Sequence, residues 1–290
     1  MTQQAHLSDA FPLANGVAIP CLGYGTWRMQ DGAETVAAIQ TALSLGYRHI
    51  DTAAYYRNEA SVGQALRASG LPREAVFLTS KVWNTDRGYA PTKAAFQATL
   101  DRLGTDYLDL YLIHMPYGDY HGSWRAMEAL LQAGRVRAIG VCNFLPDRLV
   151  DLILTHSVVP AVNQIELHPF CQQQALRQVM AAYHIQPMAW APFAEGQGNL
   201  FHHPVLSAIG QAHGKTPAQV VLRWLRQEGI VAIPKSVHPQ RIRENWDIED
   251  FTLSPGELTQ IRALDQNRSW ILDVPNLTEV YRLHNIPVSQ

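Results

Sequence analysis

Four residues of this chain have side chains that could together polarise a carbonyl group and deliver a proton to it. They are Asp51, Tyr56, Lys81 and His114. A free tyrosine has a pKa of about 10, which is too high for easy proton transfer at neutral pH, and a neighbouring ammonium group such as Lys81 would lower it. Asp51 would hold that ammonium by a charge-assisted hydrogen bond, Tyr56 would act as a general acid, and neutral His114 would orient the carbonyl oxygen. Because the set contains no reductant, a hydride would have to come from a cofactor.

Most of these side chains stand where a short apolar run ends. Asp51 follows the run 47–50, Lys81 the run 75–80 and His114 the run 108–113. The same pattern places five further residues at the ends of short apolar runs: Asn143, Gln164, Glu166, Trp190 and Lys235. The chain has only four lysines, so a lysine at such a position indicates a need for a compact charge with a titratable proton. Parallel strands buried on both faces have such runs, and (β/α)₈ barrels build their active sites at the C-terminal ends of their strands.

Eight strand patterns separated by helix patterns follow one another along the chain, which favours an α/β fold of the (β/α)₈ TIM-barrel type over an open doubly wound sheet. The expected strands are 22–25, 48–51, 76–81, 108–113, 136–141, 162–165, 186–190 and 230–233. The expected helices are 34–45, 59–68, 91–103, 124–133, 146–155, 173–183 and 217–228. No linker interrupts this alternation, so residues 1–290 are expected to form one domain.

Other segments fall outside the repeat. Residues 11–19 contain an Asn15-Gly16 turn between apolar arms, which predicts an N-terminal β-hairpin that could plug the barrel floor. Extra helices are expected at 204–212 and 255–264, with a glycine-containing loop at 192–199. Residues 269–290 show no helical period and are expected to form a C-terminal tail over the barrel mouth.

Composition excludes several classes of protein. With 47% hydrophobic and 17% charged residues and a net charge of −2, the chain is typical of globular proteins and has no basic field for nucleic acid. No apolar run approaches the roughly 20 residues that span a bilayer, and residues 1–9 lack the pattern of a signal peptide. Three cysteines do not make a disulfide framework, so a cytoplasmic location is expected. A monomer that acts on a small carbonyl substrate is also expected. His202 and His203 have no acidic or thiol partner at ligand spacing, and no metal site is expected.

Several motifs together resemble the aldo-keto reductase family, over residues 22 to about 267. They are His49-Ile50-Asp51-Thr52-Ala53, Thr79-Ser80-Lys81-Val82-Trp83, Ile113-His114-Met115-Pro116, Gly140-Val141-Cys142-Asn143-Phe144, Asn163-Gln164-Ile165-Glu166-Leu167-His168-Pro169 and Ile233-Pro234-Lys235-Ser236. The resemblance implies a (β/α)₈ barrel that reduces carbonyl groups with NADP(H). It also implies the family's roles for four positions: Tyr56 as proton donor, Lys81 as the residue that lowers its pKa, Asp51 as support and His114 as the carbonyl-orienting group. Short motifs of this kind are shared with the diketogluconate-reductase-like bacterial branch.

The same resemblance implies a set of cofactor contacts. Asn143 and Gln164 would bond the nicotinamide carboxamide, Trp190 would stack on the ring, and Thr26 and Trp27 would lie beside it. The loop that begins with Pro192 and Phe193 would fold over the pyrophosphate. The adenosine end would be held by Lys235, Ser236 and Arg241 at the 2′-phosphate, and by Glu244 and Asn245 at the adenine. A helix N-terminus after the eighth strand is where barrel phosphate sites lie.

The substrate pocket is expected to be largely apolar. Its expected walls are Trp27, Trp83, His114, Trp270 and Leu272. Small aldehydes, 2-oxoaldehydes, aromatic aldehydes and keto-sugar acids are all compatible with such walls. Two departures from the family pattern concern the cofactor: Cys142 and Ala191 stand where the family usually has serine, and a thiol is a poorer hydrogen-bond donor.

Two other functions fit parts of the sequence. Lys81 could act as a Schiff-base nucleophile in a lyase, as lysines of barrel aldolases do. A reductase-like barrel could also serve as a nicotinamide-cofactor sensor without turnover. The complete set of four chemical groups favours the reductase over the sensor.

Overall fold

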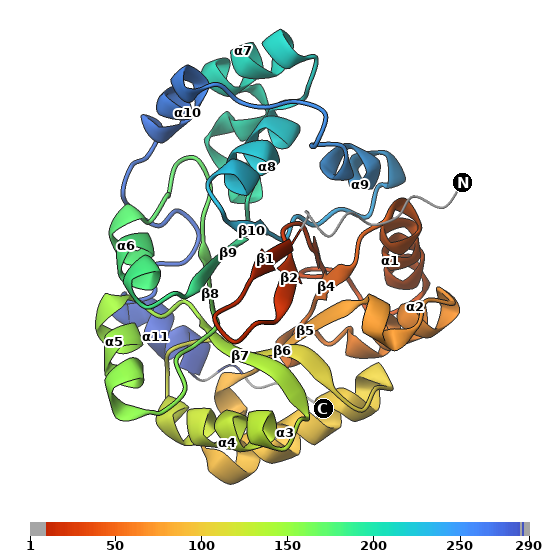
Figure 1. Ribbon diagram of the computed structural model, residues 1–290, viewed down its shortest axis with the longest axis vertical. Coiled ribbons are helices and arrows are strands. Elements are labelled where there is room, and N and C mark those ends of the chain that lie inside the picture. The colour runs from red at the N-terminus through yellow and green to blue at the C-terminus, as the bar shows by residue number, and fades with distance from the viewer. Residues whose placement is uncertain (1–9, 285, 287–290) are drawn as a thin grey trace.

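The computed structural model describes residues 10–284 and 286, and its centre is a sheet of eight parallel strands curled into a barrel (Figure 1). The strands are β3 (Tyr24–Gly25), β4 (His49–Asp51), β5 (Phe77–Val82), β6 (Leu108–Ile113), β7 (Val136–Cys142), β8 (Val162–Glu166), β9 (Gln186–Trp190) and β10 (Val231–Ala232). Each strand pairs in parallel with the next along the chain. The residues of the hairpin turn 15–16 lie within this description, whereas residues 1–9 lie outside it.

The first and last strands close the barrel. Leu22 bridges Ala232 in parallel, and the Gly23 amide donates to the Ala232 carbonyl at 2.8 Å. Farther along, the Gly25 amide donates to the carbonyl of Pro234 at 3.0 Å. A Cβ on Gly25 would stand 2.8 Å from the Ile233 carbonyl oxygen, so only glycine allows the two strands to approach this closely. The predicted α/β barrel is therefore confirmed.

Strand β6 shows why the strands read as continuous apolar runs. All six of its residues are buried. Leu110 and Leu112 face the barrel interior, whereas Tyr111 and Ile113 face the surrounding helices, where Tyr111 meets Phe96 edge-on at 5.0 Å between ring centroids. Both faces of a parallel strand are covered, so its residues are mostly apolar. The buried Asp109 is the exception, and it pairs with Arg73 and Arg137.

Helices surround the strands (Figure 1). They are α1 (Ala33–Leu45), α2 (Glu59–Ala68), α3 (Tyr89–Leu103), α4 (Tyr120–Gln132), α5 (Pro146–Thr155), α6 (Gln174–Ala182), α7 (Pro204–His213), α8 (Pro217–Gln227), α9 (Pro239–Trp246), α10 (Pro255–Arg262) and α11 (Leu277–His284). Sequence signals mark some of their ends: Thr216 and Gln219 form a reciprocal capping box on α8, and Gly104 ends α3 in the left-handed conformation. The extra helices expected at 204–212 and 255–264 correspond to α7 and α10.

An antiparallel hairpin of β1 (Ala10–Pro12) and β2 (Ala18–Pro20) lies across the ring of strands (Figure 1). Its Leu13 and Ile19 are buried in one apolar cluster with Phe77 and Leu110 from inside the barrel. Asn15 of the turn donates to the Arg137 carbonyl at 2.9 Å. The hairpin thus closes the end of the barrel opposite the strand C-termini, as the sequence predicted.

The C-terminal tail differs from its prediction in one respect. Residues 269–276 are irregular, but α11 follows them, so the expectation that the whole tail lacks a helix was wrong. Val280 and Leu283 of α11 pack in a cluster with Trp83 and Tyr117, and the Asn84 side chain donates to the Leu283 carbonyl at 2.9 Å. The last part of the predicted tail, residue 285 and residues 287–290, lies outside the described residues. None of the described helices is long and apolar enough to span a bilayer.

Candidate active site

A buried ion pair lies at the centre of the barrel mouth. Lys81, near the end of β5, and Asp51, the last residue of β4, are 0% and 1% exposed, and Lys81 Nζ lies 2.5 Å from Asp51 Oδ1. The ammonium also donates to the Thr52 carbonyl at 2.9 Å, and Gln164 Nε2 donates to the other carboxylate oxygen at 2.8 Å. Burial alone would lower the pKa of Lys81, but Asp51 and Tyr56 outweigh it and the pKa is raised. Burial raises the pKa of Asp51 against the opposing pull of Lys81 and Gln164. The lysine therefore keeps its proton at neutral pH.

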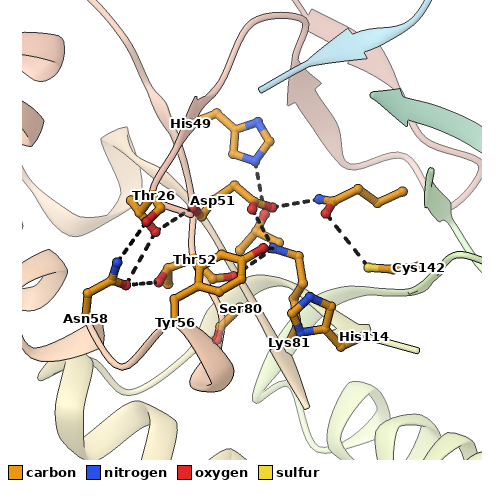
Figure 2. Close-up of polar contacts among 12 residues, drawn as sticks. Thr26, His49, Asp51, Thr52, Tyr56, Asn58, Ser80, Lys81, His114 and Cys142 are labelled. Atoms are coloured by element: carbon orange, nitrogen blue, oxygen red, sulfur yellow. Dashed lines mark hydrogen bonds and ion pairs between the residues drawn. The ribbon is translucent and has the colours of Figure 1, made fainter. Parts of the chain in front are cut away.

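Tyr56 stands directly over this pair. It ends the short 3₁₀ turn η2 (Ala54–Tyr56), and its hydroxyl accepts a hydrogen bond from Lys81 Nζ at 3.2 Å. Figure 2 shows Lys81 reaching between Asp51 and Tyr56, with His114 beside them. Burial raises the pKa of Tyr56 to about 12, and Lys81 only reduces that rise. Lys81 thus lowers this pKa in the expected direction, but desolvation outweighs the ammonium and the pKa is raised overall. A phenol with this pKa is fully protonated at neutral pH, as a proton donor must be.

His114 follows β6 and completes the group. Its ring meets Tyr56 edge-on at 5.6 Å between centroids and Trp83 at 5.0 Å. Burial, with smaller contributions from Lys81 and Arg87, lowers the pKa of His114 well below its ordinary value, so the imidazole is neutral as expected. Its Nδ1 is buried without a hydrogen-bond partner among the described residues. A buried polar atom without a partner is rare in a finished core.

The loop that carries Tyr56 is held by an interior asparagine. Asn58 is fully buried; its amide donates to the Thr26 and Met29 carbonyls at 2.8 and 3.0 Å and accepts from the Thr52 hydroxyl at 2.9 Å. Thr26 in turn donates to the Asp51 carbonyl at 3.0 Å. Thr26 and Asn58 thereby tie the β3 and β4 loops together and fix the position of Tyr56.

Two amides and an indole lie on the other side of the ion pair. Asn143 follows β7 with a left-handed backbone (φ 62°), and its side chain donates to the His114 carbonyl at 3.2 Å and accepts from Trp190 Nε1 at 2.8 Å. Gln164 bonds Asp51, so these amides connect the ends of five strands, β4, β6, β7, β8 and β9. Cys142 lies 3.9 Å from Gln164 Oε1, and burial raises the pKa of its thiol. Cys142 therefore provides only a weak sulfur contact at a position where serine is usual.

A single cavity of 510 Å³ opens above these groups. Of the expected site residues it is lined by Trp27, Asp51, Tyr56, Trp83, His114, Asn143, Gln164, Trp190, Pro192, Phe193, Lys235 and Leu272. The expected residues that lie outside its lining are Thr26, Lys81, Ser236, Arg241, Glu244, Asn245 and Trp270. Lys81 lies beneath Tyr56 and Thr26 supports the floor, so both act on the cavity through their neighbours.

One end of the cavity is aromatic. Tyr55 stacks on Trp83 at 3.9 Å between centroids and 14° between planes, and on Trp27 at 5.6 Å and 20°. Ile271 and Leu272 of the tail complete this wall. Trp270 does not: its ring stacks on Phe170 at 4.7 Å and 13°, so its expected place in the pocket wall is corrected.

A cation also lines the cavity, and a second lies nearby in the sequence. Lys235 lines the cavity just before α9 and is exposed, as is Arg241 in the first turns of that helix. Within the described part of the chain, neither cation forms an ion pair with an acidic side chain. The Ser236 hydroxyl accepts from the His238 amide at 3.1 Å, Glu244 accepts from Gln240 at 2.8 Å, and Asn245 is buried. Two unpaired cations beside a helix N-terminus are a suitable environment for a phosphate.

A nicotinamide dinucleotide fits this donor set. The neutral amides of Asn143 and Gln164 and the indole of Trp190 suit a carboxamide-bearing ring, and Lys235 and Arg241 suit a phosphate at the far end. The loop after Trp190, η5 (Ala194–His202), is glycine-containing with several left-handed residues inside, and its Glu195 pairs with Arg28 across the cavity at 3.1 Å. No set of three His, Cys, Asp or Glu side chains in the described residues is arranged to hold a metal ion.

Some cavity residues were not foreseen. Tyr55 was not predicted as a site residue, although it is adjacent to Tyr56 in the same loop. Arg282 and Leu283 reach the cavity from α11; the three-residue spacing of Val280 and Leu283 could have indicated that helix. The role of Glu166, which bonds the tail across 103 or more residues of sequence, had no local signal.

Comparison with known proteins points in one direction. The model of the Aldo/keto reductase family matches residues 21–266. The glyoxal reductase of Bacillus subtilis (strain 168) is 47% identical over 262 residues, which cover 90% of this chain and 94% of that protein.

Solved structures agree with the sequence comparison. An aldo/keto reductase from Brucella melitensis is 46% identical with a TM-score of 0.85, and the match covers 88% of this chain and 99% of that one. A Bombyx mori aldo-keto reductase solved in complex with NADP is 34% identical with a TM-score of 0.86, over 91% of this chain and 95% of that one.

Proposed function

The chain belongs to the aldo/keto reductase family, and we propose that it reduces small aldehydes and ketones to alcohols with NADP(H) as its cofactor. The observation that carries this proposal is the contact of the Tyr56 hydroxyl with Lys81 Nζ at 3.2 Å, beside a neutral His114, on the floor of one cavity. One (β/α)₈ domain provides all of these groups.

The cofactor, when bound, supplies a hydride to the carbonyl carbon. Tyr56 gives its phenolic proton to the carbonyl oxygen, so the C=O bond becomes a CH–OH group. The phenolate that remains is stabilised by the Lys81 ammonium, which is itself held by Asp51 at 2.5 Å. The high pKa of Tyr56 in the resting site means that this stabilisation matters most as negative charge develops on the oxygen.

His114 and the aromatic wall orient the substrate. Neutral imidazole donates a hydrogen bond to the carbonyl oxygen without competing for its proton. Trp27, Tyr55 and Trp83 exclude water from the reacting carbon and favour an apolar or planar substituent. The name of the Bacillus subtilis relative, glyoxal reductase, supports small aldehydes and 2-oxoaldehydes as substrates.

The lyase alternative is disfavoured by the state of Lys81. A Schiff-base nucleophile needs a free amine, whereas Asp51 and Tyr56 raise the pKa of Lys81 and the side chain is fully buried. Trapping with borohydride in the presence of a carbonyl substrate is expected to leave Lys81 unmodified.

The adjacent tyrosines give a matched test of the reductase. Oxidation of NADPH would be followed at 340 nm with a panel of aldehydes, in the wild type and in Tyr56→Phe and Tyr55→Phe. Loss of a general acid is expected to lower kcat about 10²- to 10⁴-fold in Tyr56→Phe, whereas Tyr55→Phe removes a hydroxyl from the same cavity without removing the proton donor and is expected to stay within about tenfold. Tight NADPH binding with no turnover of any carbonyl would instead support a cofactor sensor.

A further inference from the structure

The carboxylate of Glu166 collects an unusual number of hydrogen bonds from one distant segment. Glu166 ends β8 and is 2% exposed. Its oxygens accept from the Ser269 hydroxyl at 2.6 Å and from the consecutive backbone amides of Trp270, Ile271 and Leu272 at 2.7, 3.2 and 3.2 Å. His168 Nε2 lies 3.1 Å from the same carboxylate.

These bonds give an irregular segment its shape. Residues 269–276 belong to no helix or strand, so their amides have no regular backbone partners and must be satisfied otherwise when buried. A charged acceptor makes the shorter and stronger kind of bond. Burial alone would raise the pKa of Glu166, but the bonds from His168, Ser269 and Trp270 lower it below its ordinary value, so the carboxylate is ionised at neutral pH.

The segment held in this way carries part of the cavity wall. Ile271 and Leu272 line the cavity, where Leu272 packs in one cluster with Tyr55 and Trp83, whereas Glu166 itself lies outside the lining. Trp270 packs on the other side, between Phe170 and Gly198 of the η5 loop. A Cβ on Gly198 would stand 2.5 Å from the Trp270 ring, so the tail and the loop fit directly against each other.

We propose that Glu166 is a positioning residue that sets the substrate-side wall of the cavity by fixing the amides of residues 270–272. The proposal rests on the proposed carbonyl reduction, since it assigns that wall to the substrate. Glu166 touches neither the reacting atoms nor the cavity. It decides how closely Ile271 and Leu272 approach the aromatic wall, and hence which carbonyl substituents fit.

The test compares Glu166→Gln with Glu228→Gln. Glu228 also joins distant elements through a carboxylate, to Arg177 at 2.9 Å and Arg262 at 3.0 Å, but it does not line the cavity. Hydrogen exchange measured by mass spectrometry would follow the amides of residues 270–272, and kinetics would compare a small 2-oxoaldehyde with a bulky aromatic aldehyde. In Glu166→Gln we expect exchange at these amides to be about tenfold or more faster, and KM for the bulky aldehyde to rise about tenfold, while KM for the small one changes by less than about threefold. Glu228→Gln is expected to alter neither.

Three results would overturn the proposal. The first is unchanged exchange at residues 270–272 in Glu166→Gln. The second is faster exchange at these residues with an unchanged ratio of the two KM values. The third is uniformly faster exchange across the barrel, which would indicate a general loss of stability. If the wild type turned over no carbonyl, carbonyl reduction would fail as the function. The exchange data would then still decide whether Glu166 fixes the segment.

Discussion

Replacing Lys81 by methionine separates the structural role of the buried ion pair from its chemical one. Methionine keeps most of the volume of Lys81 but removes its charge, which leaves the Asp51 carboxylate with Gln164 as its side-chain donor. Both members of the pair are essentially inaccessible to solvent. Removing one partner of a buried pair costs about 3–5 kcal/mol, so the free energy of unfolding at neutral pH is expected to fall by that amount.

The loss should depend on pH with a definite sign. Without Lys81, less opposes the burial that raises the pKa of Asp51. A carboxyl whose folded pKa lies above its unfolded value takes up a proton on folding, so the variant loses stability as the pH rises through the raised pKa. The deficit relative to the wild type is therefore expected to be smallest near about pH 4, close to the unfolded pKa of aspartate, and to grow toward neutral pH.

Urea denaturation of three variants would measure this effect. Lys81→Met is compared with the double variant Asp51→Asn/Lys81→Met, which removes both charges, and with Lys93→Met, which makes the same change at an exposed position. The double variant is expected to regain at least about 2 kcal/mol of the loss, and Lys93→Met to stay within about 0.5 kcal/mol of the wild type. A double variant as unstable as Lys81→Met, or a deficit that does not change with pH, would refute the reasoning. Reductase activity is expected to be lost in Lys81→Met and in the double variant, because the ammonium stabilises the Tyr56 phenolate.

Three further predictions concern other parts of the molecule. Arg241→Ala is expected to raise the Kd of NADPH about tenfold, because a charge-assisted bond is lost, and to leave the Kd of NADH nearly unchanged. Fluorescence titration with both cofactors checks this. An equal loss of affinity for both cofactors would show that Arg241 does not bind the 2′-phosphate. Burial holds the pKa of His114 well below 6.5 and raises that of Tyr56 to about 12, so neither group titrates between about pH 6 and about pH 9. Single-turnover rates are therefore expected to be constant over this range. A fall in the rate centred near pH 6.5 would contradict a neutral His114. Gly63→Ala would place a Cβ 2.2 Å from the Leu103 carbonyl oxygen and is expected to destabilise the fold by about 1–3 kcal/mol in urea denaturation, whereas an unchanged midpoint would show that α2 and α3 can separate at little cost.

The barrel could be predicted from the sequence because its strands are buried on both faces. A run such as Leu108–Ile113 is predominantly apolar, with Asp109 paired to arginines as its exception. The residue that follows it, His114, lies at the rim because the strand ends there. Asp51, Lys81 and His114 could therefore be predicted to converge, because each lies at the end of a strand and the strands are parallel in one barrel. Figure 2 shows the same convergence in space.

What escaped prediction depends on contacts between distant segments. The pKa of Tyr56 rises because Trp27, at 4.9 Å between ring centroids, and other neighbours bury it, and burial is not visible in the loop that carries the tyrosine. Trp270 was predicted to line the pocket because it is aromatic and close to Leu272 in the sequence. An irregular segment has no fixed side-chain period, so the direction of this side chain could not be predicted. The shape of that segment is set by Glu166, more than 100 residues earlier in the chain.

Transfer of deuterium to a small aldehyde from NADPH that carries two deuterium atoms at nicotinamide C4 tests the central claim most directly. The alcohol product would be analysed by mass spectrometry, with rates compared in the wild type and Tyr56→Phe. We predict one deuterium on the carbinol carbon and a rate at least about 10²-fold lower in Tyr56→Phe. An alcohol without deuterium, or equal rates in the two proteins, would contradict carbonyl reduction with Tyr56 as the proton donor.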